Sequence, residues 1–443
     1  MNGFLVFLFF ALSSLVVVYA SPTVCTPESE LSPHILYVAL QSRGILTLSF
    51  DPSKSVQTSL EVLDTNTDAG FMPGWLTARG DKIYSISRTG FPTNASISGG
   101  LFSFKKYRRQ YGEEGTRGAL GMSLLSNVTS GGVGAVYCDV SRDRRTISAA
   151  NIDGSTVCIH PLSEGGIIGE ASYLFKYTLS HPGPGTNGSQ VQSNPHEAIF
   201  DPSGQYMFVN DRGADRIYVY NVDGPYNVTR ISTVVLPPGT GPRHSTFRAF
   251  NSTRTYMYLA SELDNTVRVF TLDGVHNDDH ERKIKHYPPT LDISLRQTAS
   301  TLGPGSYRTS PNDTFLASEI ALSNDGKFAY VSNRATRTLS SDTLAIYSVH
   351  PNIGNDSAHL VYLGQNETYG KIPRHFSLSP DMETRYAAVA NEVSQNLVIL
   401  ERDPATGFMT GIKGKISFGT FDTTQNLGPA AVIWEGRNAD EGQ

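Results

Sequence analysis

Short runs of apolar and polar residues, rich in β-branched and aromatic side chains, recur along most of the chain. The clearest set lies between Asn194 and Tyr220, where an apolar run from Pro195 is followed by a turn and by further runs from Tyr206 and Arg216. The turn contains Asp, Pro, Ser and Gly, which favour a tight reversal of the chain. This pattern predicts three antiparallel strands joined by short connections.

The same set of runs recurs with altered residues. Later copies begin at Pro242, Ala317 and Pro373, and two weaker copies precede the first, near Trp75 and Tyr137. A repeat of about 40 to 50 residues with this content is typical of the blades of a β-propeller rather than of a helical solenoid. The six copies therefore predict six blades around a central channel.

The two ends of the chain supply the pieces of a seventh blade. Apolar runs at 35–39 and 44–50 lie near one end, and a run at 430–434 lies near the other. Pairing them in one sheet would close the ring and remove two exposed sheet edges. We therefore predict an all-β fold, a single seven-bladed β-propeller over residues 34–436. The longest interruption, 274–312, is expected to hold an outermost strand and an extended loop.

The N-terminal segment indicates where the protein goes. Residues 1–20 are mostly apolar and end at Ala20 in the small-residue pattern of a signal-peptide cleavage site. Residues 21–33 would then form the N-terminal tail of the mature protein, and residues 437–443 a C-terminal tail. A signal anchor is the alternative, but no basic residue flanks the apolar segment. We expect a secreted or cell-surface protein without a transmembrane segment after signal removal.

Glycosylation signals favour the same location. Eight Asn-x-Ser/Thr triplets occur in the chain, and together with a signal peptide they indicate a secreted glycoprotein. Their asparagines are Asn94, Asn127, Asn187, Asn227, Asn251, Asn312, Asn355 and Asn366.

The chain has 3 cysteines, so at least one thiol stays unpaired in an oxidising compartment. Cys138 and Cys158 fall on the first and third strands of one predicted blade, which lie roughly 9.5 Å apart. A disulfide tolerates a Cα separation of only about 7 Å, so we predict that these two do not bridge each other. Cys25 could reach one of them, and the sequence does not decide between the pairings.

Charge and motifs narrow the function classes. A formal net charge of −5, without basic stretches that interleave aromatics, gives no reason to expect a nucleic-acid partner. The sequence has no Walker loop, dinucleotide fingerprint or Ser nucleophile elbow. No spacing of ligand residues supports a metal ion, calcium included, and we expect no cofactor.

The candidate functional residues occur at the positions where the aligned repeats differ. In a propeller, the residues just before each innermost strand and the loops after each second strand converge near one mouth of the channel. The aligned positions combine guanidinium, carboxylate and imidazole groups: His196, Arg243, Ser318, Arg374; Glu197, His244, Glu319, His375; and Arg212, Glu262, Arg334, Glu392. Arginine binds carboxylates through paired hydrogen bonds, and histidine and glutamate can move protons. The columns predict a site for a small anionic substrate, a carboxylate or a lactone.

Each of these residues also has a structural interpretation. Polar side chains at blade edges cap strands and pair with neighbouring blades, and such ion-pair networks imitate active sites. For any single residue the two interpretations carry similar weight. The whole cluster favours function, because simple capping would repeat one residue type whereas the charge here alternates between blades.

Several motifs carry a family resemblance: Pro-His-Glu at 195–197, Gly-Pro-Arg-His at 241–244, Ser-Glu-Leu-Asp-Asn at 261–265 and Ile-Pro-Arg-His at 372–375. They resemble the seven-bladed lactonase family, which includes bacterial 6-phosphogluconolactonases and fungal carboxy-cis,cis-muconate cyclases. The resemblance spans nearly the whole mature chain and is most specific over 194–400. It implies a seven-bladed propeller, in line with the repeat count.

The resemblance also implies roles for particular residues. The catalytic set of the fungal cyclase falls by motif on His196, Arg243, Glu262 and Arg334. His196 and Glu262 would then move a proton, while Arg243 and Arg334 bind carboxylates and stabilise enolate-like charge. Further substrate contacts are expected from His244, Glu319, Arg374 and His375. The implied reaction interconverts an unsaturated carboxylic acid and its lactone.

Three functions stay open. The first is the secreted cyclase or isomerase, and the second is a lactonase in which the same residues activate water against a lactone carbonyl. The third is a non-catalytic propeller glycoprotein, an adhesin or antigen. Val136 and Tyr137 stand where other repeats carry His or Arg, so one side of the pocket should be apolar. Secretion fits poorly with a phosphorylated or CoA-linked substrate, which is normally intracellular.

Overall fold

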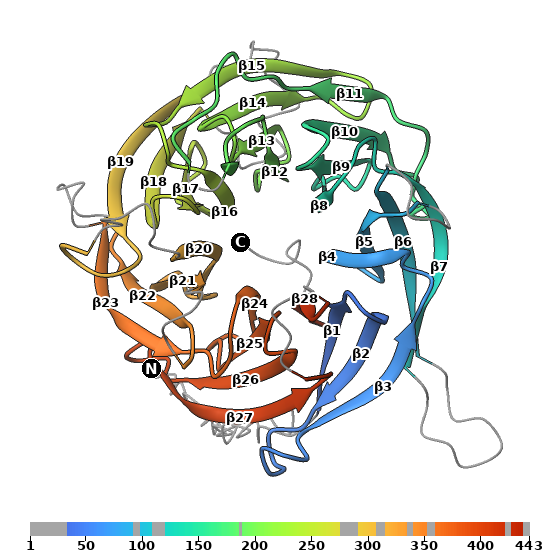
Figure 1. Ribbon diagram of the computed structural model, residues 1–443, viewed down its shortest axis with the longest axis vertical. Helices are drawn as coiled ribbons and strands as arrows, with labels where there is room; N and C mark the ends of the chain where they lie inside the picture. The colour runs from blue at the N-terminus through green and yellow to red at the C-terminus, as the bar shows by residue number, and fades with distance from the viewer. Residues whose placement is uncertain are drawn as a thin grey trace, which may run out of the picture. The chain divides into compact units, whose positions relative to one another are not determined.

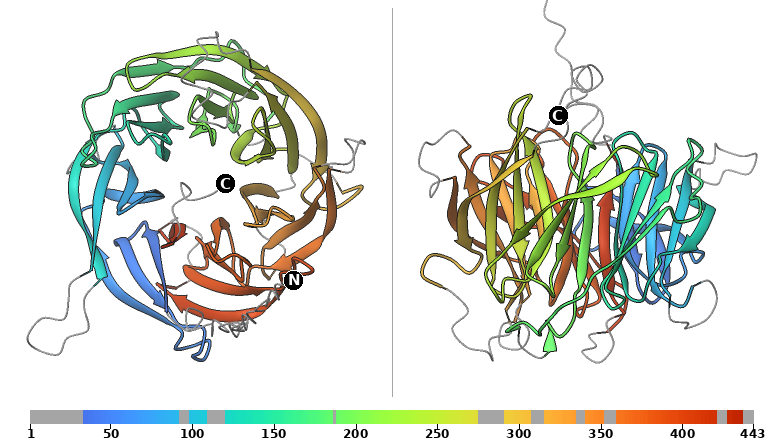
Figure 2. Two further views of the ribbon diagram at one scale, coloured as in Figure 1. Left: turned by 180° about the vertical axis from the view of Figure 1, so that it is seen from behind. Right: turned by 90° about the horizontal axis from the view of Figure 1, so that it is seen from above.

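Twenty-eight strands, β1 to β28, are present in the described part of the chain, arranged as seven four-stranded antiparallel sheets. The computed structural model describes residues 33–91, 98–108, 120–185, 188–274, 291–306, 315–334, 340–351, 359–420 and 427–436. The sheets stand as blades around a central channel (Figure 1). Seen from the side, the strands run across the depth of the ring (Figure 2). The predicted all-β, seven-bladed propeller is confirmed.

Six blades each use four consecutive strands, with the first at the channel and the fourth outside (Figure 1). The first three of these blades consist of β4 (Phe71–Arg79), β5 (Lys82–Thr89), β6 (Gly100–Arg108) and β7 (Leu120–Thr129); β8 (Ala135–Val140), β9 (Thr146–Asn151), β10 (Thr156–Pro161) and β11 (Tyr173–Lys176); and β12 (Pro195–Phe200), β13 (Tyr206–Asp211), β14 (Arg216–Val222) and β15 (Val228–Val235). The next three consist of β16 (Pro242–Ala249), β17 (Arg254–Ser261), β18 (Thr266–Asp273) and β19 (Asp292–Ser300); β20 (Leu316–Leu322), β21 (Phe328–Arg334), β22 (Thr343–Val349) and β23 (Leu360–Glu367); and β24 (Pro373–Leu378), β25 (Tyr386–Asn391), β26 (Asn396–Arg402) and β27 (Met409–Ser417).

The seventh blade joins the two ends of the described chain. Its innermost strand is β28 (Pro429–Trp434), followed outward by β1 (His34–Leu40), β2 (Gly44–Phe50) and β3 (Leu60–Asn66). β28 pairs antiparallel with β1, and Trp434 lies opposite Leu36. Ring closure by both chain ends, predicted from the apolar runs, is confirmed.

Burial decreases from the channel side to the outside of a blade. The second strand β13 is buried at every position, whereas the outermost strand β11 alternates between partly buried and exposed residues. The apolar residues meet in layers between neighbouring blades, as where Tyr137 and Val157 of one blade pack with Met207 and Val209 of the next. Fully burying a large apolar side chain stabilises the fold by roughly 1.5–3 kcal/mol, so these layers hold the blades together.

The turn between β12 and β13 shows why its sequence favours a tight reversal of the chain. Asp201 accepts hydrogen bonds from the backbone N–H groups of Ser203 at 3.0 Å and Tyr206 at 2.8 Å. Gly204 has a φ of 70°, and a Cβ there would lie 2.9 Å from Arg142 Cβ. Glycine is therefore the residue that fits this left-handed and crowded position. The geometry of this turn sets the register in which β12 pairs with β13.

The two cysteines of the β8–β11 blade do not form a disulfide with each other, as predicted. Cys138 and Cys158 are buried free thiols, and Ala149 on the strand between them pairs with both. Burial raises the pKa of the Cys158 thiol to about 12, which makes it a poor nucleophile. Cys25 lies outside the described residues.

Other segments predicted from the sequence divide between described and undescribed residues. Asn127, Asn227 and Asn251 are exposed, while Asn366 is partly buried and its side chain hydrogen-bonds the backbone of Met409. Residues 1–32, residues 437–443 and four glycosylation asparagines lie outside the described residues: Asn94, Asn187, Asn312 and Asn355. Within 274–312, the expected outermost strand is β19. Among the residues described, no helix is long and apolar enough to cross a membrane.

Candidate active site

A repeated β-bulge marks the innermost strand of every blade. The ladder between the first and second strands shifts register at Gly74, Val136, His196, Arg243, Ser318–Glu319, Arg374 and Ala430. A bulge leaves its residue out of the ladder and re-aims the side chain. The column chosen from the aligned repeats is therefore the bulge column, which places His196, Arg243 and Arg374 at one mouth of the channel.

Five arginines line a cavity of about 540 Å³ at this mouth, called the arginine cavity below. They are Arg88, Arg212, Arg243, Arg334 and Arg374. His196, Glu262 and Asn194 share the lining, and Val136 supplies the predicted apolar side. The four residues predicted as catalytic, His196, Arg243, Glu262 and Arg334, thus meet in one cavity, together with Arg374.

Glu262 lies at the centre of three guanidinium groups. Its Oε1 accepts a hydrogen bond from Arg212 Nε at 2.9 Å, and its Oε2 lies 3.1 Å from Arg243 Nε and 3.0 Å from Arg334 Nη2. Burial by itself would raise the pKa of Glu262, but the three arginines outweigh it and lower the pKa to about 2. Glu262 is therefore a carboxylate at neutral pH, and its single charge faces three positive charges.

A second pair of arginines lies in the same cavity. Arg374 Nη1 is 3.2 Å from Glu392 Oε1, and Arg88 Nη2 is 3.8 Å from Asp153 Oδ2. Burial and the neighbouring charge of Arg374 lower the pKa of Arg88. The five arginines thus face three carboxylates, those of Glu262, Glu392 and Asp153, which leaves two positive charges in excess. Such an excess favours an anionic ligand.

His196 is neutral in this setting. The residue is 5% exposed, and its Nδ1 atom has no hydrogen-bond partner among the described residues. Burial, followed by the charges of Arg243 and Arg374, holds the pKa of His196 well below its usual value. A neutral imidazole beside an anion-binding cavity can accept a proton.

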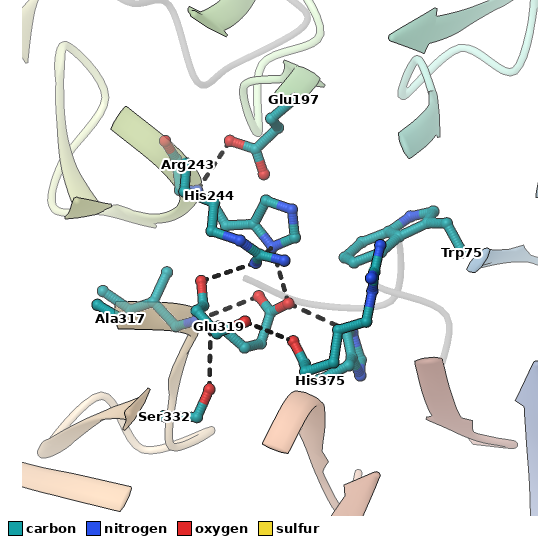
Figure 3. Close-up of polar contacts among 12 residues, drawn as sticks. Trp75, Glu197, Arg243, His244, Ala317, Glu319, Ser332 and His375 are labelled. Carbon is teal, nitrogen blue, oxygen red and sulfur yellow. Dashed lines mark hydrogen bonds and ion pairs between the residues drawn. The ribbon is translucent and has the colours of Figure 1, made fainter. Parts of the chain in front are cut away.

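A layer of side chains crosses the channel (Figure 3), and its His244 contacts Arg243 and His196 of the arginine cavity. This layer, called the septum below, consists of Trp75, Tyr137, His244, Glu319 and His375. The Trp75 ring lies 4.9 Å from both the His244 and His375 rings and 4.5 Å from the Tyr137 ring. Glu319 Oε2 lies 2.8 Å from His244 Nδ1 and 3.7 Å from His375 Nε2.

A second cavity of about 390 Å³ lies on the other side of the septum. Its lining includes residues further along the same innermost strands, such as Asp139, Thr246 and Leu378. No described residue lines both cavities. Three of the residues predicted to bind substrate, His244, Glu319 and His375, therefore lie in the septum, and only Arg374 lines the arginine cavity.

Sequence reasoning missed Arg88 and did not select Arg212 for the site. Arg88 follows Ser87 near the end of the second strand of its blade, as Arg212 follows Asp211. Aligning these two strand ends would have placed Arg88 in the same column as Glu262 and Arg334. Within the described ranges, no group of three His, Cys, Asp or Glu residues is arranged to hold a metal ion.

Comparison with known proteins agrees with the fold. The model of the family "Lactonase, 7-bladed beta-propeller" matches residues 36–421. A 6-phosphogluconolactonase of Formosa agariphila is 24% identical over 368 residues, 82% of this chain and 90% of the relative. A 6-phosphogluconolactonase of Bacillus subtilis is 26% identical over 297 residues, 67% of this chain and 74% of the relative.

Solved structures share the fold. The periplasmic gluconolactonase of Pseudomonas aeruginosa superposes with a TM-score of 0.70 at 22% identity, over 91% of this chain and 99% of that one. The family match covers six blades in full and most of the seventh, from Leu36 of β1 onward, and ends before the closing strand β28. The chain therefore belongs to the lactonase family of seven-bladed β-propellers.

Proposed function

We propose that the protein hydrolyses a small anionic lactone in the arginine cavity. The observation that carries this proposal is the neutral imidazole of His196 beside three arginines that converge on Glu262. A base that is free of its proton at neutral pH can activate water, and fixed positive charge can stabilise the oxyanion that forms. The relatives named as 6-phosphogluconolactonases support the same reaction class.

Each residue has a defined part in the proposed reaction. His196 takes a proton from water as the water oxygen bonds to the lactone carbonyl carbon. Arg243 and Arg334 stabilise the negative charge on the carbonyl oxygen. The bond from this carbon to the ring oxygen then breaks, and His196 returns the proton to that oxygen. The product is a hydroxy acid, so one water is consumed and His196 ends neutral.

Glu262 has a different role from the one implied by the family resemblance. With a pKa of about 2 it holds no proton at neutral pH, so it cannot serve as an acid there. Its carboxylate instead holds Arg212, Arg243 and Arg334 in place. We assign it to orienting these three guanidinium groups.

The second arginine pair suggests the shape of the substrate. Arg88 and Arg374 would bind a second anionic group, a carboxylate or a phosphate, while the lactone carbonyl lies near Arg243. If residues 1–20 direct export, as we propose, a carboxylate-bearing lactone is more accessible outside the cell than a phosphorylated one. Such a substrate fits the excess of two positive charges in the cavity.

Interconversion of an unsaturated acid and its lactone is the second candidate. In the ring-opening direction, neutral His196 could remove a proton from carbon while the arginines stabilise the enolate-like charge. Ring closure instead requires a donor that protonates carbon, and neither His196 nor Glu262 carries a proton at neutral pH. The protonation of the site therefore favours hydrolysis.

Isotope labelling separates the candidates. Aldonolactones with and without a carboxylate or phosphate would be incubated in H₂¹⁸O, and we expect one ¹⁸O atom in the product carboxylate. Replacing His196 with alanine should lower kcat by about 10²- to 10⁴-fold, and Arg243→Ala by about 10²- to 10³-fold. Arg230, exposed on β15, provides a control, and Arg230→Ala should leave kcat unchanged.

Three results would contradict hydrolysis. Product formation without ¹⁸O incorporation would favour the cyclase. Lactone binding without turnover would favour a binding glycoprotein. Full activity of a folded His196→Ala variant would exclude His196 as the base.

A further inference from the structure

Glu319 connects the septum to the arginine cavity through one short chain of contacts. Its Oε2 lies 2.8 Å from His244 Nδ1, and the same nitrogen lies 3.1 Å from Arg243 Nη1 (Figure 3). Arg243 Nη1 also donates to Ser318 O at 2.9 Å, and Arg243 Nε faces Glu262. A carboxyl group outside the arginine cavity is thus two contacts away from the guanidinium proposed to stabilise the oxyanion.

His244 also contacts the proposed base. Its ring meets the ring of His196 edge to face, with 4.8 Å between the centroids. His244 is 2% exposed, so its orientation is set by these neighbours and by Glu319. A change at Glu319 that turns the His244 ring would therefore move both Arg243 and His196.

The Glu319–His244 contact requires a shared proton. A carboxylate and an unprotonated imidazole nitrogen would both be acceptors, so at 2.8 Å either Glu319 or His244 Nδ1 must donate. The other charged or titratable groups around Glu319 are Arg243 on β16, Glu197 and His196 on β12, Tyr137 on β8, and Arg374 and His375 on β24. Burial raises the pKa of Glu319 despite the attraction of Arg243, and burial holds the pKa of His244 well below its usual value. The proton therefore lies on Glu319 at neutral pH.

We propose that Glu319 is a positioning residue for the hydrolysis: by sharing one proton with His244 across the septum, it fixes the orientation of Arg243 and of the His196 ring. This inference rests on the proposed function. When Glu319 loses its proton at alkaline pH, His244 Nδ1 becomes the donor and Nε2 the acceptor. His244 Nε2 is buried without a hydrogen-bond partner among the described residues. The loss of its proton therefore alters the side of the ring that faces away from Glu319.

Glu197 provides a matched control. It is a buried glutamate on the innermost strand β12, two blades away from the strand β20 that carries Glu319, and like Glu319 it lines the second cavity. Its Oε2 accepts hydrogen bonds from Ser245 N at 2.8 Å and Asn210 Nδ2 at 2.6 Å rather than from an imidazole. The amide oxygen of glutamine can accept both of these bonds, so Glu197→Gln should change little.

The test compares Glu319→Gln with Glu197→Gln in the full chain. In Glu319→Gln we expect kcat to fall by about 10- to 100-fold, because misplaced catalytic groups cost activity on this scale. KM should stay within about 2-fold, because Arg88 and Arg374, which would bind the anionic group of the substrate, do not contact Glu319 or His244 through this chain. In the wild type, kcat should change at the alkaline pH at which Glu319 loses its proton. This change should be absent in Glu319→Gln and should persist in Glu197→Gln.

Histidine ¹⁵N chemical shifts provide a measurement that does not depend on turnover. In the wild type, His244 should carry its proton on Nε2 at neutral pH and on Nδ1 at alkaline pH, and Glu319→Gln should abolish this change. If Glu319→Gln does not fold, Glu319→Asp, which retains the acid but withdraws it from His244, replaces it in the same comparison.

The outcomes distinguish the two proposals. A wild type that hydrolyses lactones, together with a folded Glu319→Gln variant of unchanged kcat and pH profile, would overturn the positioning role and leave the hydrolysis intact. A wild type that turns over no lactone would overturn the proposed function, and an unchanged His244 tautomer across the pH range would then overturn the shared proton as well.

Discussion

At the scale of single residues, the surroundings rather than the residue type decide the chemistry. His196 and Glu262 are both familiar proton carriers, and the arginines lower the pKa of both, with different consequences for their charge. Burial, with the positive charges added, keeps a proton off His196 and leaves it neutral, whereas the positive charges outweigh burial at Glu262 and keep it ionised. The sequence placed both residues in the site but could not supply these protonation states, because they depend on distances of about 3 Å across blades.

The buried histidines should make the protein sensitive to acid. Burial lowers the pKa of His375 from 6.5 to about 3, so between these values the unfolded chain binds a proton that the folded chain does not. Stability therefore falls as the pH drops below 6.5, by up to about 1.4 kcal/mol per pH unit for one such group. We expect His375→Asn to show a shallower decrease than the wild type in urea unfolding between the two pKa values.

Above the ordinary pKa of histidine both states of His375 are neutral, so the two proteins should show equal slopes there. Equal slopes in acid as well would mean that His375 is protonated in the folded protein. The measurement therefore tests directly whether His375 is neutral in the folded protein.

At the scale of elements, one bulge per blade converts a repeated strand into a site. His196 and Glu197 are neighbours in sequence, but the bulge takes His196 out of the ladder and lets it line the arginine cavity. Glu197 resumes the ladder and lines the second cavity. Alignment of the repeats found both columns, but a bulge has no marker in the hydrophobic pattern, so the separation of the columns by the septum could not be predicted.

Closure of the ring depends on a close backbone contact before β28. A Cβ on Gly428 would lie 1.9 Å from the carbonyl oxygen of Glu392, which is backbone and cannot rotate away. Gly428→Ala should therefore displace the start of β28 and destabilise the protein by about 1–3 kcal/mol. Urea unfolding monitored by tryptophan fluorescence would measure the change, since Trp434 belongs to β28.

A matched glycine lies on the outermost strand of the preceding blade. A Cβ on Gly411 of β27 would meet no atom within 4 Å. Gly411→Ala should therefore leave stability unchanged or raise it by about 0.5–1 kcal/mol, since alanine costs less entropy than glycine. Equal stabilities of the two alanine variants would show that the Glu392 contact is not tight.

At the scale of the whole molecule, the charge of the arginine cavity has the opposite sign to the net charge of the chain. The chain carries a formal net charge of −5, yet the arginine cavity has two positive charges in excess. Electrostatic attraction near the mouth acts over about the Debye length, which shrinks from about 30 Å at 0.01 M salt to about 8 Å at 0.15 M. The rate at which an anion binds should therefore depend on the positive charge of the cavity and not on the net charge of the chain.

For an anionic lactone, kcat/KM should fall several-fold as salt rises over this range. A neutral lactone of the same ring size serves as the control, and its kcat/KM should change little. A rise of kcat/KM with salt for the anion would indicate that repulsion by the overall negative charge dominates. Steady-state kinetics at several ionic strengths would measure both.

The sequence by itself determined the fold class, the number of blades, the closure by both ends and the columns that hold the site. Each follows from patterns within a repeat, where strand, turn and strand are adjacent in the chain. The family resemblance then selected His196, Arg243, Glu262 and Arg334 from these columns as one group. Their meeting at one mouth follows from the rotational symmetry of repeated blades.

Only the tertiary structure decided which side chains share a cavity, which cross the channel and which carry protons. Glu319 and His244 are 75 residues apart in sequence, and the charge of Arg374 lowers the pKa of Arg88 although the closing blade lies between their two blades. Burial and charge at such contacts shift each pKa, and both are properties of the assembled ring. For this reason the sequence could select the residues of a candidate site, and the packing of seven blades around one channel determined which of them meet and which are protonated.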